Sequence, residues 1–123
     1  MERHRFDELL EKLREFPGIE EVFLLDQDGN ILHKSEDFQL SADEAKRILE
    51  SWKNHEGSLI FQGARYAMLK SEELQLAAKN MVGGKGNVVG SITKEGDYLI
   101  AHTREEGLII LEWSIFINKV AWS

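Results

Sequence analysis

The residues of this chain that could bind a phosphate group are Gly83, Gly84, Lys85 and Gly86, because glycine amides and a lysine ammonium form phosphate-binding loops. Such a loop needs a serine or threonine directly after the lysine and then a helix. Here no hydroxyl side chain follows Lys85, the spacing of the leading glycine differs, and a predicted strand comes next. We therefore interpret the segment as a loop that does not bind nucleotide.

Histidine side chains, which could hold a metal ion or transfer a proton, are scattered along the chain. His4, His33, His55 and His102 fall on four different predicted elements, and no two of them have the spacing that metal ligands show on a helix. His102 alternates with Ile100, and we expect it on the solvated face of a strand. Metal binding is not predicted.

Asp26 and Asp28 form an acidic pair in an Asp-x-Asp-Gly turn. The turn lacks the downstream glutamate of a calcium-binding loop, so both aspartates are interpreted as caps of the turn. The chain has no cysteine and no Gly-x-Ser-x-Gly elbow, which removes the common nucleophile arrangements. We expect no catalytic residue, no metal and no cofactor.

The composition is that of one globular domain spanning residues 1–123, with 42% hydrophobic and 30% charged residues. A net charge of -7 opposes contact with a phosphate backbone, so nucleic acid is not an expected partner. The first residues are charged throughout and contain no apolar stretch, which is unlike a signal peptide. Together with the absence of cysteine, this predicts a cytoplasmic protein.

Hydrophobic periodicity predicts the order of the elements. The N-terminal helix shows apolar residues at helical spacing and ends at Pro17 and Gly18. A hairpin follows, with strands at residues 22–25 and 31–33. A second helix begins at a capping box, Ser41 to Glu44, in which both side chains would bond free amides at the helix start.

In the second half of the chain, the hydrophobic pattern predicts five strands and a last helix. The strands are expected at residues 58–61, 65–70 and 74–79, followed by two more that flank a turn at residues 94–97. The last helix, about residues 107–122, is apolar nearly all round and must be covered on more than one side. Most of it is interpreted as core, which leaves Leu108, Leu111 and Ile115 as a candidate partner contact.

The whole is an α+β fold with a central antiparallel sheet of about six to seven strands. We expect the N- and C-terminal helices on one face of the sheet and the remaining helix on the other.

At this point the order of motifs resembles the profilin family over nearly the whole chain. The similar segments are LLDQDGNILHKSEDFQLSADEAKRIL, GSLIFQGARYAMLK and GGKGNVVGSITKEGDYLIAHT, followed by the closing helix. Short loops make the chain similar to a divergent, archaeal profilin of the Asgard kind. The resemblance implies a monomeric, cytoskeletal protein that binds the actin monomer and regulates filament assembly.

Profilins place their actin surface on the later strands and the start of the last helix. Carried over by motif, the resemblance implies basic side chains around a small apolar patch, a pattern that complements an acidic partner. The implied contact residues are Arg65, Lys70, Lys79, Lys85, Asn87, Arg104, Leu108, Leu111 and Asn118.

Many profilins also bind proline-rich segments between their terminal helices through stacked aromatic rings. This chain departs from that pattern, since Arg5 and Phe6 stand in the region of the early tryptophan and Leu32 stands where a tryptophan is common. The remaining candidates for a polyproline groove are Phe6, Leu32, Trp113, Phe116 and Trp122, and we expect weak or no binding. Phosphoinositide binding is a further family trait, and the acidic charge of the chain opposes it.

Two other classes share part of this element order. A roadblock or longin-type domain, a dimeric scaffold that regulates a small GTPase, has about three strands between its second and third helices, whereas residues 57–103 have room for five. A ligand-sensing domain of the PAS type would need a polar-lined cavity. The strand count and the oligomeric state distinguish the first alternative from a profilin.

Overall fold

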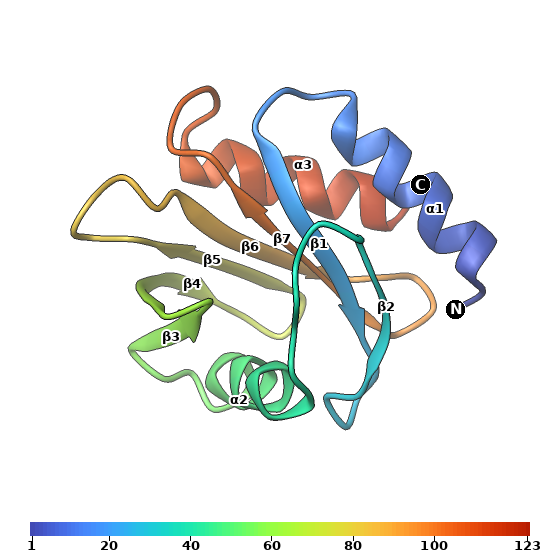
Figure 1. Cartoon of the computed structure of the whole chain (residues 1–123), viewed down its shortest axis with the longest axis horizontal. Helices are drawn as coiled ribbons and strands as arrows, with labels where there is room; N and C mark the ends of the chain where they lie inside the picture. Colours follow the sequence, from blue (N-terminus) through green and yellow to red (C-terminus); the bar gives the residue numbers. More distant parts are fainter.

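The computed structural model describes residues 1–123 as three helices and one seven-stranded antiparallel sheet (Figure 1). The strand order across the sheet is β2-β1-β7-β6-β5-β4-β3. In chain order the elements are α1 (Arg3–Arg14), β1 (Ile19–Leu25), β2 (Ile31–Lys34), α2 (Ala42–Lys53), β3 (Ser58–Phe61), β4 (Ala64–Ser71), β5 (Gln75–Lys79), β6 (Asn87–Ile92), β7 (Tyr98–Thr103) and α3 (Ile110–Ala121). Five strands therefore lie between α2 and α3, as the sequence predicts.

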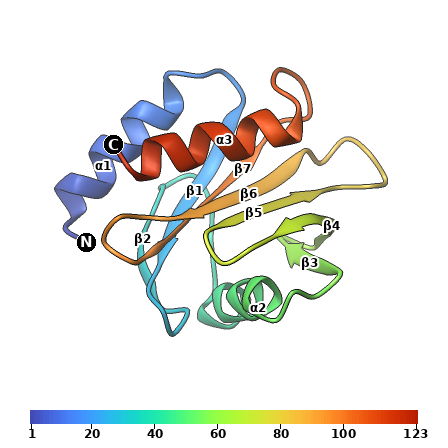
Figure 2. The ribbon, with the colours of Figure 1, turned by 180° about the vertical axis from the view of Figure 1, so that it is seen from behind.

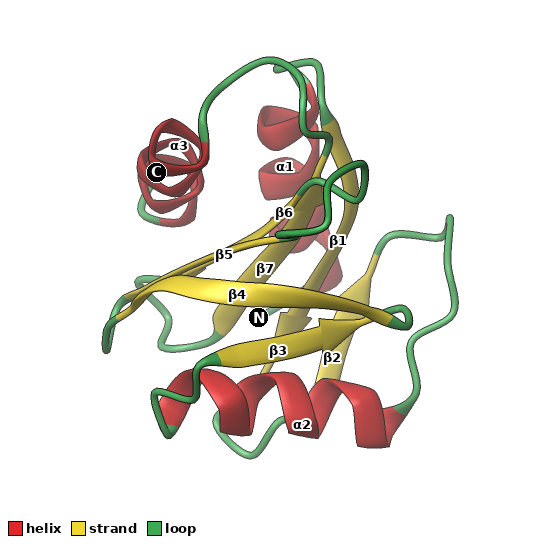
Figure 3. Cartoon of the chain, turned by 90° about the vertical axis from the view of Figure 1, so that its left-hand side faces the viewer, coloured by secondary structure: helices red, strands yellow, loops and turns green.

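The sheet separates two hydrophobic cores, because alternate residues of each strand face opposite sides. Helices α1 and α3 cover one face and α2 covers the other, which confirms the predicted arrangement (Figures 1 and 3). Trp113 is fully buried in the core under α1 and α3, and Trp52 is 1% exposed in the core under α2. We call these two sides the α3 face and the α2 face.

The first hairpin turn is held by the carboxylate of Asp26. Its Oδ1 accepts the backbone N–H groups of Asp28 and Asn30, each at 2.9 Å, and its Oδ2 accepts the Asn30 side-chain amide at 3.1 Å. Burial opposes ionisation of Asp26, but these hydrogen bonds and nearby Lys46 lower its pKa below the ordinary value. The predicted cap is confirmed for Asp26, whereas the Asp28 side chain is exposed and accepts no hydrogen bond.

Helix α2 starts at half of the predicted capping box. Ser41 Oγ accepts the N–H of Glu44 at 3.1 Å, as expected. The reciprocal bond is not made, because the Glu44 carboxylate instead accepts the backbone N–H of Gln62 at 2.6 Å and its side-chain amide at 3.0 Å. The prediction for Glu44 is therefore wrong: this carboxylate joins α2 to the β3–β4 turn rather than closing its own helix.

Helix α3 begins at Ile110, three residues later than the sequence predicts. Gly107 has a left-handed φ of 100°, which a right-handed helix cannot include. The Glu112 carboxylate accepts the N–H of Ile109 at 3.1 Å and so satisfies one of the free amides at the helix start. Each of the three helices has 12 residues, too few to cross a lipid bilayer.

Candidate functional site

One part of the α3 face is left open by the helices. Helix α3 packs mainly against β6 and β5 and to a lesser extent against β7, so that β4 lies beyond its edge (Figure 2). The loop of residues 81–86, which we call the glycine loop, extends past the start of α3 on this side of the molecule (Figure 2). This region contains most of the residues that the sequence singles out as a binding surface.

Strand pairing determines which basic side chains reach the open region, since residues directly opposite each other in neighbouring strands share a face. Lys79 is opposite Asn87, and Lys70 is opposite Ala77 of the α3-side core. Arg65 alternates with Tyr66, which is part of the α2-side core, and therefore points the other way. The three cations thus lie on the α3 face, and Arg65 and Lys70 belong to β4, beyond the strands that α3 packs against.

Three basic side chains of the predicted set have no ion-pair partner within the chain. No carboxylate lies within 4.0 Å of the charged groups of Arg65, Lys79 or Lys85, whereas Lys70 Nζ lies 3.6 Å from Glu72 and Arg104 forms an ion pair of 3.1 Å with Glu20. A chain with a net charge of -7 therefore presents three cationic side chains that no carboxylate of the chain pairs. Local positive potential of this kind attracts an acidic partner in spite of the overall charge.

Large apolar side chains are exposed beside these cations, on the glycine loop and on the start of α3. Large exposed apolar side chains that gather in one region mark interaction sites more often than singly scattered ones do. Their exposed fractions are 69% for Met81, 95% for Val82, 64% for Ile109, 51% for Leu111 and 64% for Ile115. We define the docking surface as these five residues with Arg65, Lys70, Lys79, Lys85 and Arg104.

Three residues of the predicted set are not presented on this surface. Asn87 is 3% exposed, and its Nδ2 donates to Thr103 Oγ1 at 3.1 Å beneath the helix. Asn118 is half-buried and donates to Ser91 Oγ at 2.9 Å, which ties α3 to β6. Leu108 packs against the α3-side core. These three side chains bond or pack inside the molecule instead of facing outward.

Three exposed residues of the docking surface, Met81, Val82 and Ile109, do not belong to the predicted set. A signal for the first two is present in the sequence, because two apolar residues directly precede a run of glycines in a loop. A loop that cannot bury such side chains presents them to solvent. Ile109 depends on the late start of α3 and has no comparable signal.

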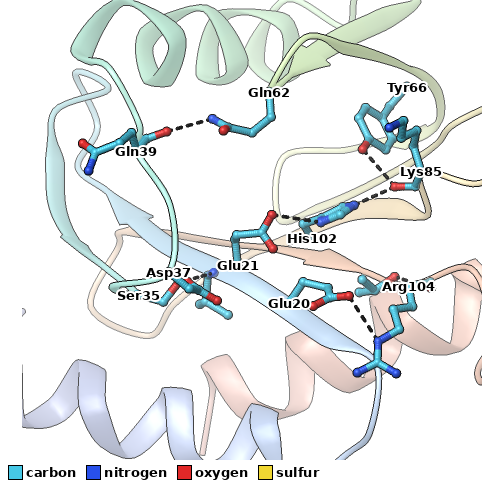
Figure 4. A network of polar contacts seen from close by, with 12 residues as sticks. Glu20, Glu21, Ser35, Asp37, Gln39, Gln62, Tyr66, Lys85, His102 and Arg104 are labelled. Carbon is cyan, nitrogen blue, oxygen red and sulfur yellow. Dashed lines mark hydrogen bonds and ion pairs between the residues drawn. The ribbon is translucent and has the colours of Figure 1, made fainter.

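The base of the glycine loop is joined to the α2 face by a polar network (Figure 4). The carbonyl oxygen of Lys85 accepts the Tyr66 hydroxyl at 2.9 Å and His102 Nε2 at 2.6 Å. The other ring nitrogen of His102 lies 3.3 Å from a carboxylate oxygen of Glu21. Burial and the nearby charge of Glu21 raise the pKa of Tyr66 to about 12, so this hydroxyl stays a donor at neutral pH.

His102 does not lie on a solvated face, which corrects the expectation from the sequence. Residues two apart on a strand share a face, so His102 lies on the same side as Ile100, which is in the α2-side core. The imidazole ring packs against Phe61 and Tyr66 with ring centroids 5.4 and 6.0 Å away, and its side chain is 18% exposed. It is a half-buried member of the polar network.

The five aromatic and apolar residues considered for a polyproline groove do not form one exposed stack. Phe6 and Trp113 are fully buried, and Phe6 stacks on His33 at 5.4 Å. Phe116 and Leu32 are partly buried against the same core, and Trp122 alone is largely exposed, at 49%. Rings that are covered by the chain's own core cannot grip an extended ligand.

No family model matches the chain. The chain is 65% identical over 123 residues, all of both chains, to Loki profilin-3 of Lokiarchaeum sp. (strain GC14_75). It is 32% identical over 79 residues to Odin profilin of Odinarchaeota yellowstonii (strain LCB_4), covering 64% of this chain and 63% of that one.

Solved structures share the fold at low sequence identity. LokiProfilin2 from a complex with rabbit actin aligns with a TM-score of 0.79 at 18% identity, covering 98% of this chain and 95% of that one. LokiProfilin1 from a complex with rabbit actin gives 0.75 at 18% identity, with 98% and 96% coverage. Schizosaccharomyces pombe profilin gives 0.70 at 19% identity, with 85% and 82% coverage. With full-length identity of 65% to a profilin and this fold, the chain belongs to the profilin family.

Proposed function

We propose that this profilin binds monomeric actin through the docking surface and thereby regulates the assembly of actin filaments. Two archaeal profilins with the same fold, LokiProfilin1 and LokiProfilin2, have been solved in complexes with rabbit actin. Full-length identity of 65% to Loki profilin-3 supports a conserved role within this group. The partner that we propose is therefore an actin monomer of the same cell, in the cytoplasm.

A single observation carries this proposal: the docking surface combines exposed apolar side chains of the glycine loop and the start of α3 with cations that form no ion pair within the chain. Apolar side chains such as Leu111 and Ile115 supply the buried centre of an interface, and the charged rim gives orientation and speed of encounter. Arg65 and Lys79 have no ion pair to break before they bind a carboxylate. Binding therefore desolvates few groups that are already paired.

The proposal is tested by spontaneous assembly of actin, followed by pyrene fluorescence with and without the protein. We expect the wild-type chain to lengthen the lag before polymerisation, because bound monomers cannot form nuclei. The double variant Arg65→Glu with Lys70→Glu should abolish the delay, since it reverses two charges of the docking surface.

A matched pair of single variants separates a local effect from a change in net charge. Lys79→Glu lies in the docking surface, whereas Lys94→Glu lies in the exposed β6–β7 turn at the opposite end of the sheet. Both variants change the net charge by the same amount. Equal loss of the delay in both would contradict a defined surface, and no delay with any actin, native or heterologous, would contradict the proposed function.

A further inference from the structure

The glycine loop loses more conformational entropy on folding than an ordinary loop of its length. Gly83, Gly84 and Gly86 all have left-handed backbone angles, with φ of 95°, 85° and 75°. Glycine gives up more backbone freedom on ordering than any other residue. The side chains at the tip, Met81 and Val82, are exposed by 69% and 95%, so their packing contributes little to holding the loop. A single loop conformation therefore depends on polar bonds at the base of the loop.

Asn80 lies at this base, at the point where the chain leaves the sheet. The last residue of β5 in its ladder with β4 is Lys79. Directly after it, the Asn80 side chain continues the contact with β4, because its Nδ2 donates to the Arg65 carbonyl at 2.8 Å. Its Oδ1 accepts the N–H of Gly83 at 2.9 Å, and its backbone N–H donates to the Gly86 carbonyl at 3.1 Å. One residue thus connects β4 with the middle and the end of the glycine loop.

The Asn80 amide has a single orientation that satisfies both neighbours. A carbonyl oxygen only accepts and an N–H only donates, so Nδ2 must face Arg65 and Oδ1 must face Gly83. Asn80 is 5% exposed, so water competes little with these bonds. The bond from the Gly84 N–H to the Glu105 carboxylate, at 2.8 Å, is exposed and does not have this protection. The buried amide is therefore the stronger of these two anchors.

Both ends of the Asn80 bridge lead to the docking surface. Arg65, whose carbonyl accepts one bond, contributes a cation from β4, and the loop that contains Gly83 presents Met81 and Val82. Asn80 is too buried to touch a partner itself. An apolar side chain could fill the same space, but it would leave a buried carbonyl and a buried N–H without these bonds. What asparagine provides at this position is the bridge.

We propose that Asn80 is a positioning residue for the docking surface: its amide bridges the Arg65 carbonyl and the Gly83 N–H and so fixes Met81 and Val82 relative to the cation on β4. A loop that is ordered before the partner arrives loses little further entropy on binding, which raises the affinity. The effect on actin rests on the proposed function, whereas the ordering of the loop in the free protein does not.

The bridge is tested in the free protein by nitrogen-15 relaxation of the loop amides, which reports their order on the fast timescale. We expect Asn80→Ala to lower the order parameters of Gly83 and Gly84. Asn80→Ser should lower them less, because a serine hydroxyl makes the same bond to a following amide more weakly and is too short to reach Arg65. The matched control is Asn54→Ala, since Asn54 is exposed at the end of α2 and should leave the loop unchanged.

Order parameters of Gly83 and Gly84 that stay at the wild-type value in the Asn80 variants would overturn the proposal. An equal loss of order in Asn54→Ala would do the same, because the effect would then not come from the bridge. Should Asn80→Ala fail to fold, Asn80→Ser decides, since a loop as ordered as in the wild type contradicts a role of the Arg65 bond.

A double-mutant cycle on actin affinity distinguishes positioning from a general loss of stability. Affinities are compared at a temperature at which urea titration shows every variant to be folded. We expect Asn80→Ala to weaken binding about three- to tenfold, as the loss of buried hydrogen bonds and of loop order implies. The loss should be smaller in a Val82→Ala background, because positioning the tip matters less when its apolar side chain is gone.

Fully additive losses, or a lowered urea midpoint with unchanged affinity, would show that Asn80 acts on stability alone and would contradict the proposed role in binding. Both outcomes leave the proposed function intact. Absence of actin binding by the wild type contradicts the proposed function instead, and the relaxation experiment then decides on the bridge by itself.

Discussion

Replacement of Gly86 by alanine should destabilise this profilin far more than the same replacement at Gly84, two residues earlier in the glycine loop. Both glycines have left-handed backbone angles, with φ of 75° at Gly86 and 85° at Gly84. A Cβ on Gly84 would meet no atom within 4 Å, whereas a Cβ on Gly86 would overlap the carbonyl oxygen of Thr103 and lie 3.0 Å from its carbonyl carbon. The pair therefore separates backbone strain from a steric clash.

The magnitudes follow from these contacts. Alanine in the left-handed region costs about 1–2 kcal/mol, which is the whole expected loss for Gly84→Ala. At Gly86 the backbone must also move away from Thr103, which weakens the pairing of Asn87 with Thr103 and the 3.1 Å bond from the Asn80 N–H to the Gly86 carbonyl. Two weakened hydrogen bonds and the residual overlap bring the loss for Gly86→Ala to about 3–5 kcal/mol.

Equilibrium unfolding in urea, followed by tryptophan fluorescence, measures the free energy of unfolding of both variants. Trp52 and Trp113 are buried, so their emission changes on unfolding. We expect a difference of about 2–3 kcal/mol between the variants, a substantial part of the stability of a small domain. Equal losses within about 0.5 kcal/mol would refute the reasoning, because the close approach of β7 would then not be what requires glycine at residue 86.

Three further predictions concern other parts of the molecule. Gly90→Ala should lower the free energy of unfolding by about 1–3 kcal/mol, since its Cβ would lie 2.9 Å from the buried ring of Trp52; an unchanged urea midpoint would contradict this close packing. Asp26→Ala should cost about 1 kcal/mol at neutral pH. The pKa of Asp26 is lowered in the folded protein, so its contribution to the free energy of unfolding is present above the pKa of the unfolded state and is lost as the pH falls through the pKa of the folded state. The stabilities of wild type and variant, measured by urea titration, should therefore converge at acid pH. A difference in stability that stays constant with pH would argue against the hydrogen bonds of the turn. Titration with decaproline should leave tryptophan fluorescence nearly unchanged, because Trp113 is fully buried and the exposed Trp122 has no aromatic ring packed beside it; saturation at micromolar peptide would show that an aromatic groove exists.

The order and type of the elements follow from local signals in the sequence. Apolar residues at helical spacing in α1 end at Pro17, and the Asp26 turn joins two short alternating strands, so both features depend only on residues close in the chain. The capping box shows the limit of such reasoning. Ser41 behaves as its local pattern predicts, but Glu44 is bonded to Gln62, which is 18 residues away.

The composition of the docking surface illustrates the same limit. The sequence identifies Lys70 and Lys79 as basic residues of the later strands and Lys85 as a basic residue of the glycine loop, and the motif order assigns them to a surface. Burial of Asn87 and the enclosure of His102 depend on what packs above each face of the sheet, which no local pattern contains. Met81 and Val82 do have a signal in the sequence, since they are two apolar residues directly before a run of glycines, but the periodicity of helices and strands does not reveal it.

The sequence by itself determined the helices, the strands, the turns and the family, because these depend on short-range periodicity and on motifs in a given order. Only the tertiary structure decided which side chains share the open face. Lys70 has the same parity as Tyr66 and Met68 and would face α2 in a regular strand, but an irregularity in the β4–β5 register between Met68 and Lys70 sets it opposite Ala77, on the α3 face. A single extra residue in one strand reverses the direction of the side chains that follow, and this reversal is visible only once the partner strand is in place.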